Sequence, residues 1–170
     1  MLSPNKFWDL NVALVVAICV SMAVAVATLS MHSAQAGQSA GPDPWMAGQL
    51  VQPADLVQEL SAAKTSTAPT IVYVGFRTLF EGGHIPGASF HGTASAELGL
   101  ADLKKWAASL PRGTNLVIYC GCCPFDRCPN IRPAFDALRA MGFTHLRLLV
   151  LAKSFAADWV EKGYPMEKGR

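Results

Sequence analysis

Residues 115–142 read "NLVIYCGCCPFDRCPNIRPAFDALRAMG", in which a strand pattern, a cysteine-rich loop and a helix pattern follow one another. The run at 115–119 is apolar and partly β-branched, which is typical of a strand buried on both faces. The helix pattern starts after Asn130 and ends at Gly142, and both residue types are common at helix ends. The loop between them holds four of the five cysteines of the chain. We therefore expect the chemistry of the protein to lie in this loop.

Strand and helix patterns alternate on both sides of this stretch. Further strands are expected at 49–51, 70–75, 88–90 and 145–151, and helices from Pro53, over 96–111 and over 154–163. Such alternation predicts one α/β domain in three layers, with a central parallel sheet and helices on both faces. In such folds a ligand binds beyond the carboxyl ends of the strands. The cysteine loop starts at one of these ends.

The N-terminal segment has the layout of an export signal. Val12–Leu29 carries no charge, Lys6 precedes it, and small residues follow, with cleavage expected after Ala36. The apolar stretch has 18 residues, which is also enough for a helix that spans a bilayer. A cleaved signal and an uncleaved apolar anchor helix both stay open. Either one predicts that the rest of the chain lies in the periplasm, free or attached to the inner membrane.

Composition divides the chain into three parts: a signal or anchor at 1–36, a linker rich in Gly, Ser and Pro at 37–48, and the α/β domain at 49–168. The formal net charge is +2, and the basic residues are scattered rather than clustered. We therefore expect no nucleic-acid partner. Contact with a membrane is expected only through the N-terminal segment.

A reactive cysteine needs an environment that stabilises its thiolate. A free thiol has a pKa near 8.5, which a helix N-terminus or a nearby cation can lower. The loop offers both, since Asn130 is expected to cap the helix that starts at Ile131 and Arg127 precedes it by a few residues. Backbone amides that turn around a cysteine also form an anion-binding nest. The loop is therefore expected to stabilise a thiolate, a persulfide or a bound anion.

Three stretches resemble the rhodanese family of sulfurtransferases: "YC" at the end of a strand before an arginine-containing loop and a helix, "GHIPGA" at 83–88, and "SFAADWVEKGYPME" at 154–167. The resemblance covers residues 49–168. It implies a rhodanese-like fold and an enzyme that carries sulfane sulfur as a cysteine persulfide. The sulfur would come from thiosulfate or a similar small anionic donor and pass to a thiol or protein-thiol acceptor. The resemblance implies no cofactor and no metal.

The resemblance implies that Cys120 is the nucleophile and that Arg127 is the basic residue that closes the loop. Six residues separate the two here, whereas the family usually has four. Counting four back from Arg127 reaches Cys122, so Cys122 stays open as the nucleophile, and Cys123 is a third candidate. Four residues are expected to contact the donor: Gly121, Cys123, Asn130 and Arg77. The acidic residue common after the second strand of the family is replaced by Gly75 and Phe76.

Other readings of the loop stay open. The pair Cys120 and Cys123 has the spacing of a thiol–disulfide oxidoreductase, and a non-enzymatic module that binds sulfur or anions is also conceivable. A four-cysteine metal site is disfavoured, because adjacent Cys122 and Cys123 cannot easily turn to one tetrahedral ion. A disulfide such as Cys123–Cys128 would be compatible with catalysis by Cys120. His84 is expected to shape a turn rather than to catalyse.

Overall fold

The computed structural model describes residues 43–63 and 68–169. They form an α/β domain around a sheet of five parallel strands in the order β1-β5-β4-β2-β3. The fold class expected from the sequence is confirmed. The strands are β1 (Leu50–Val51), β2 (Thr70–Tyr73), β3 (Ser89–Phe90), β4 (Leu116–Tyr119) and β5 (Leu146–Leu149). Strand β4 is central, so the loop that follows it starts at the middle of the sheet.

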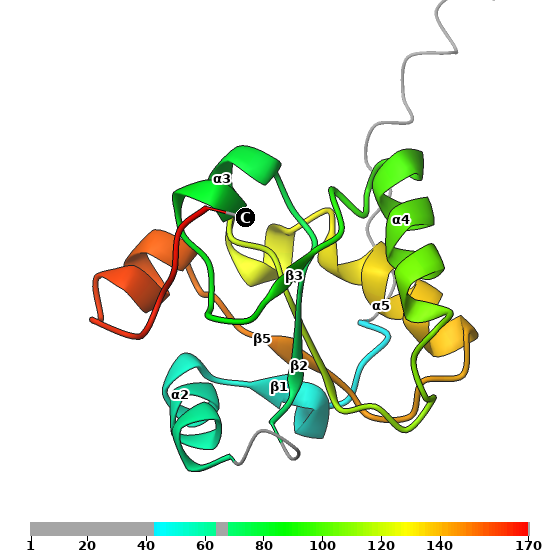
Figure 1. Ribbon diagram of the computed structural model, residues 1–170, viewed down its shortest axis with the longest axis horizontal. Coiled ribbons are helices and arrows are strands. Elements are labelled where there is room, and N and C mark those ends of the chain that lie inside the picture. Colours follow the sequence, from blue (N-terminus) through cyan, green and yellow to red (C-terminus); the bar gives the residue numbers. More distant parts are fainter. Residues whose placement is uncertain (1–42, 64–67, 170) are drawn as a thin grey trace, which may run out of the picture. The chain divides into compact units, whose positions relative to one another are not determined.

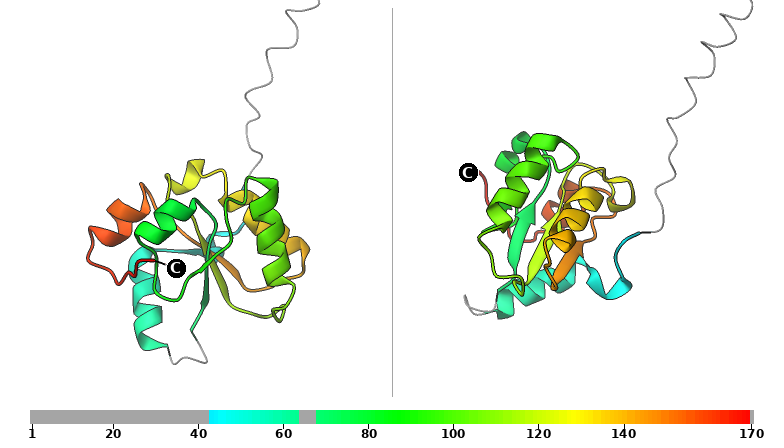
Figure 2. Two further views of the ribbon diagram at one scale, coloured as in Figure 1. Left: turned by 45° about the horizontal axis from the view of Figure 1, so that its top comes forward. Right: turned by 90° about the vertical axis from the view of Figure 1, so that its right-hand side faces the viewer.

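Helices cover both faces of the sheet (Figures 1 and 2). One face is covered by α4 (Glu97–Ala107) and α5 (Ile131–Ala140), and the other by α2 (Pro53–Ala62), α3 (Arg77–Gly82) and the short η3 (Ala156–Val160). Two further short turns are η1 (Ala47–Gln49) and η2 (Phe125–Arg127). The sequence patterns did not indicate α3, and the helix expected over 154–163 is only a single π-helical stretch.

Strand β4 is fully buried, and its side chains alternate between two apolar clusters. Leu116 and Ile118 pack with residues of α4 and α5, whereas Val117 and Tyr119 pack with residues of α2, α3 and η3. Because the side-chain period of a strand is two, the residue after Tyr119 points to the α5 side. Cys120 accordingly belongs to the cluster under α5.

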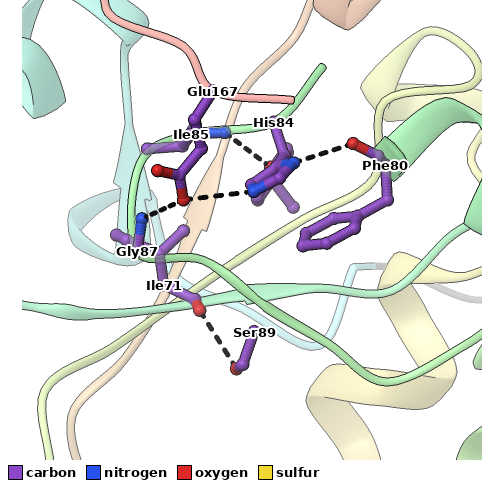
Figure 3. Close-up of polar contacts among 8 residues, drawn as sticks. Ile71, Phe80, His84, Ile85, Gly87, Ser89 and Glu167 are labelled. Atoms are coloured by element: carbon purple, nitrogen blue, oxygen red, sulfur yellow. Dashed lines mark hydrogen bonds and ion pairs between the residues drawn. The ribbon is translucent and has the colours of Figure 1, made fainter. Parts of the chain in front are cut away.

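The GHIPGA turn is held by the buried side chain of His84 (Figure 3). Its Nδ1 donates to the carbonyl oxygen of Phe80 over 2.7 Å, and its Nε2 lies 3.2 Å from Glu167 Oε1. The same carboxylate oxygen accepts a hydrogen bond from the backbone N–H of Gly87. His84 therefore joins the turn before β3 to the C-terminal segment, in agreement with the structural role expected for it.

The expected signal or anchor at 1–36 lies outside the described residues. Within 43–63 and 68–169, no helix has both the length and the apolar character that a bilayer crossing requires.

Candidate active site

Cys120 lies immediately after β4, and only 4% of its surface is exposed. The side-chain amide of Asn130 donates a hydrogen bond to Cys120 Sγ over 3.4 Å. Asn130 Oδ1 in turn accepts hydrogen bonds from Ser95 N at 3.0 Å and Ser95 Oγ at 2.8 Å. Ser95 thus fixes which end of the amide faces the sulfur, and the amide can donate to a thiolate without changing its orientation.

The prediction that the side chain of Asn130 caps α5 is wrong. Asn130 occupies the N-cap position of α5, but its side chain makes no capping hydrogen bond and its backbone is already helical. The amide is instead used by Ser95 and Cys120. Asn130 therefore contacts Cys120 as a donor to sulfur and does not cap the helix through its side chain.

The four loop cysteines are free thiols that lie close together. The distance from Cys120 Sγ to Cys122 Sγ is 3.3 Å, and that from Cys122 Sγ to Cys123 Sγ is 2.9 Å. The sulfur atoms of Cys120, Cys122 and Cys128 all lie within 4.8 Å of one another. These three thiols lie close enough together to bind one thiophilic ion. The group includes Cys122 but not the adjacent Cys123.

The surroundings of Cys120 lower the pKa of its thiol to about 6. The main cause is the neighbouring Cys128 thiol, with smaller contributions from the backbone N–H of Cys122, the Asn130 amide and the Cys122 thiol. Burial opposes these effects but does not outweigh them. The pKa of Cys128 is raised, mainly by its interaction with the neighbouring Cys120 thiol, and burial raises that of Cys122. Cys120 is therefore the thiolate of the cluster, and its neighbours are proton donors.

The two arginines predicted to serve the site each lie near an acidic residue that is close to them in the chain. The side chain of Arg127 is 79% exposed and lies 3.9 Å from Asp126, within the same turn η2. The guanidinium of Arg77 lies 4.2 Å from the centre of the Phe90 ring and pairs with Glu81. Neither arginine is among the groups that shift the pKa of Cys120. The thiolate is thus stabilised by neutral donors rather than by a cation.

The lengthened loop is tied down at two points. The backbone N–H of Phe155 donates to the carbonyl of Gly121 over 3.3 Å, and the backbone N–H of Phe125 donates to the carbonyl of Leu151 over 2.8 Å. A Cβ on Gly121 would come within 2.9 Å of Phe155 Cβ, so a side chain does not fit there. The extra residues between Cys120 and Arg127 are taken up by this anchored path and by η2.

The surroundings of Gly75 explain why the acidic residue that the family commonly has after the second strand is absent here. A Cβ at this position would lie 2.7 Å from the Tyr73 hydroxyl oxygen and 3.0 Å from Cys120 Sγ. The space that an acidic side chain would need is already filled by the phenol ring and the sulfur. The next residue, Phe76, is 53% exposed.

A pocket of about 350 Å³ opens beside the loop at Gly121. It lies between α3, η3 and the C-terminal segment, and most of its lining is apolar. Two of its lining residues, Leu79 and Val160, are large apolar side chains that are well exposed, and Lys168 adds one charge. The full lining consists of Tyr73, Thr78, Leu79, Gly82, Gly83, Gly121, Phe155, Ala156, Val160, Met166 and Lys168.

Comparison with known proteins agrees with this architecture. The chain is similar to the solution NMR structure of the rhodanese-like domain of the Alr3790 protein from Anabaena sp., with 25% identity, a TM-score of 0.52, and coverage of 71% of this chain and 79% of that one. A crystal structure of the Alr3790 protein gives 24% identity, a TM-score of 0.53, and coverage of 69% and 82%. No protein-family model matches the sequence, and no curated protein is significantly similar to it. The domain therefore has a rhodanese-like fold, as its motifs indicated.

The sequence did not reveal the roles of Cys128 and Ser95. The sequence indicates Cys128 as a disulfide partner or as one ligand of a disfavoured metal site, whereas in the structure its thiol is the strongest influence on the pKa of Cys120. A cysteine directly after the loop arginine was the available signal for it. Ser95 lies 35 residues before Asn130, and no local pattern connects the two.

Proposed function

We propose that this domain is a sulfurtransferase in which Cys120 takes sulfane sulfur from a small anionic donor such as thiosulfate. The observation that carries the proposal is the buried Cys120 thiol at the end of β4, whose pKa is lowered to about 6 by groups of its own loop. The thiolate is the nucleophilic form of cysteine. The rhodanese-like fold supports sulfur as the group transferred.

In the first step the Cys120 thiolate attacks the outer sulfur of thiosulfate. The sulfur–sulfur bond of the donor breaks, sulfite leaves with the bonding electron pair, and Cys120 becomes a persulfide anion. The negative charge is conserved, so the amides that stabilise the thiolate are also placed for the product. The backbone N–H of Cys122 and the Asn130 amide already face Cys120 Sγ, and such preorganised donors stabilise charge without rearrangement.

The lowered pKa has a limited effect on rate at neutral pH. Relative to a thiol of pKa about 8.5, a pKa of about 6 raises the thiolate fraction at about pH 7 roughly thirtyfold. Nucleophilicity falls as the pKa falls, by roughly tenfold over this range. The net gain near neutrality is therefore about threefold, and it grows as the pH decreases. The environment of Cys120 suits catalysis at mildly acidic pH.

In the second step an acceptor thiolate attacks the outer sulfur of the persulfide. The bond from that sulfur to Cys120 Sγ breaks, Cys120 leaves with the bonding pair as a thiolate, and the acceptor becomes a persulfide. We propose the apolar pocket beside Gly121 as the acceptor site. Its lining includes Gly121, the residue after Cys120, and Tyr73, whose hydroxyl oxygen and Cys120 Sγ would both lie within 3.0 Å of a Cβ on Gly75. Lys168 would attract an acidic group of the acceptor. Arg127 and Arg77 remain proposals for donor recognition from the exposed rim of the site.

The cellular setting is also a proposal. The apolar segment with Lys6 before it and small residues after it supports export of the domain, either as a soluble periplasmic protein or attached to the inner membrane. The acceptor would then be a small thiol or a protein thiol of that compartment.

Sulfite release tests the proposal. The reduced full-length chain is freed of other thiols, mixed with thiosulfate without oxygen, and quenched early with an alkylating agent. The expected result is up to one sulfite per chain and a loop peptide that gains one sulfur on Cys120. Cys120→Ser should yield neither product. Absence of sulfite from the wild-type chain would contradict the proposal.

The close thiols favour a second candidate, a thiol–disulfide oxidoreductase. Cys120, Cys122 and Cys123 form a chain of sulfur contacts of 3.3 and 2.9 Å. For this candidate, a disulfide substrate should convert two loop cysteines to a disulfide, and thiosulfate should release no sulfite. The sulfite measurement therefore separates the two candidates.

A further inference from the structure

The Cys122 thiol lies beside the sulfur that would carry the persulfide. Its Sγ is 3.3 Å from Cys120 Sγ, and its side chain is half-buried, whereas Cys120 is almost fully buried. Uptake of sulfur from a donor needs only one thiolate. The function proposed above therefore gives the Cys122 side chain no chemical step of its own.

The distance between the two sulfur atoms decides which sulfur of a persulfide Cys122 can reach. Displacement at sulfur is in-line, with the attacking and departing atoms on opposite sides of the sulfur attacked. In-line attack on the outer sulfur would put Cys122 Sγ at least two sulfur–sulfur bond lengths, about 4 Å, from Cys120 Sγ. The observed 3.3 Å is shorter. It suits attack on Cys120 Sγ itself, with the sulfane sulfur pointing away.

We propose that Cys122 resolves the Cys120 persulfide by attacking its inner sulfur, so that the domain releases hydrosulfide and closes a Cys120–Cys122 disulfide. This inference rests on the proposed sulfur uptake by Cys120. It gives the domain a second activity, the reduction of sulfane sulfur to sulfide.

The atoms and electrons of this step balance within the loop. The bond between Cys122 Sγ and Cys120 Sγ forms, and the bond from Cys120 Sγ to the sulfane sulfur breaks. The sulfane sulfur leaves with the bonding pair and takes the proton of the Cys122 thiol, so it departs as hydrosulfide. The two cysteines lose two electrons and the sulfane sulfur gains them. No outside oxidant or reductant takes part in this step.

A thiol or dithiol reductant must then reopen the disulfide. Cys122 is the more exposed of the two sulfurs, so an incoming thiol would attack there and expel Cys120. The pKa of Cys120 is lowered to about 6, and a thiol of low pKa leaves faster. Reduction would thus return Cys120 as the thiolate that accepts the next sulfur.

The other two loop thiols are less suited to the resolving step. Cys128 is buried, and its Sγ is placed only within 4.8 Å of Cys120 Sγ, whereas Cys122 Sγ lies at 3.3 Å. Cys123 contacts Cys122 Sγ at 2.9 Å, and it does not belong to the group of three sulfurs around Cys120. Cys122 is therefore the resolving thiol that the geometry favours.

The test follows sulfite and sulfide separately. The full-length chain is reduced, freed of small thiols without oxygen, and mixed with thiosulfate. The wild-type chain should release sulfite and then an equal amount of sulfide, with a Cys120–Cys122 disulfide in the loop peptide. Cys122→Ser should release sulfite, keep the sulfur on Cys120, and lose sulfide release at least tenfold until dithiothreitol is added. Cys19→Ser makes the same chemical change outside the loop and should behave as the wild type.

The amounts of sulfite and sulfide separate a failure of the resolving step from a failure of the proposed sulfur uptake. Sulfite without sulfide from the wild-type chain would overturn the resolving step and leave the sulfurtransferase proposal intact. Sulfide release that persists in Cys122→Ser and stops in Cys123→Ser or Cys128→Ser would show that Cys122 is not the resolving thiol. Absence of sulfite from both the wild-type chain and Cys122→Ser would overturn the proposed function itself, and this inference with it.

Discussion

The side-chain amide of Asn130 donates to Cys120 Sγ over 3.4 Å, so the first residue before α5 contacts the first residue after β4. Ser95 binds the other end of the same amide. This arrangement replaces the cation that a reactive thiolate commonly has nearby with neutral donors held by the fold. Each component of the arrangement can be removed separately.

Asn130→Ala removes one donor to the thiolate and should raise the pKa of Cys120. A hydrogen bond to a charged group contributes about 1.5–3 kcal/mol, which corresponds to roughly one to two pKa units. The midpoint of iodoacetamide alkylation of Cys120 against pH, read from the loop peptide by mass, should shift upward. Asn115→Ala makes the same change at the opposite end of β4 and should not move it. An unchanged midpoint in Asn130→Ala would show that the amide does not stabilise the thiolate.

Cys128→Ala should raise the same midpoint more than Cys128→Ser does. The Cys128 thiol is the main cause of the lowered pKa of Cys120, and a serine hydroxyl can still donate whereas alanine cannot. The same alkylation profile measures both variants. Equal midpoints for Cys128→Ala and the wild type would assign the lowered pKa to another group.

Arg127→Ala should separate donor binding from thiol activation. The guanidinium is 79% exposed and close to Asp126, so the alkylation profile of Cys120 should stay as in the wild type. If Arg127 binds the donor as proposed, the thiosulfate concentration for half-maximal sulfite release should rise several-fold. An upward shift of the alkylation midpoint would mean that the arginine does reach the thiolate.

Gly75→Ala should destabilise the domain and hinder Cys120. Its Cβ would lie 2.7 Å from the Tyr73 hydroxyl oxygen and 3.0 Å from Cys120 Sγ. Overpacking of this kind costs about 1–3 kcal/mol, measurable as a lower midpoint in urea unfolding. The matched control is Gly113→Ala, where a Cβ would meet nothing within 4 Å. Equal stability of Gly75→Ala and Gly113→Ala would mean that Tyr73 and Cys120 shift without cost to make room for the added methyl group.

The sheet and the place of Cys120 were predictable because they depend on local patterns. A continuous apolar strand such as β4 is buried on both faces, and its last residue sets the direction of the next side chain. The helix α3 was missed because its six residues, from Arg77 to Gly82, include only two large apolar residues. A helix that short shows no hydrophobic period.

The chemistry of the loop was only partly predictable because it depends on contacts between distant residues. Asparagine before a helix is usually a cap, and only the position of Ser95 turns this one toward sulfur. Arg127 was expected at the site from its place in the loop, but the turn η2 leaves its side chain in solvent. The order of residues could not show that Cys128, rather than an arginine, faces Cys120.

The pH dependence of sulfite release in a single turnover tests most directly whether Cys120 is the sulfur-accepting thiolate. The wild-type chain is mixed with a small excess of thiosulfate over a range of pH, and Cys120→Ser is measured in parallel. The account predicts a rate that rises with pH to a plateau, with a midpoint near 6, where Cys120 loses its proton, and no sulfite from Cys120→Ser. A midpoint near the value of an ordinary thiol, about 8.5, or sulfite release that survives Cys120→Ser, would contradict it.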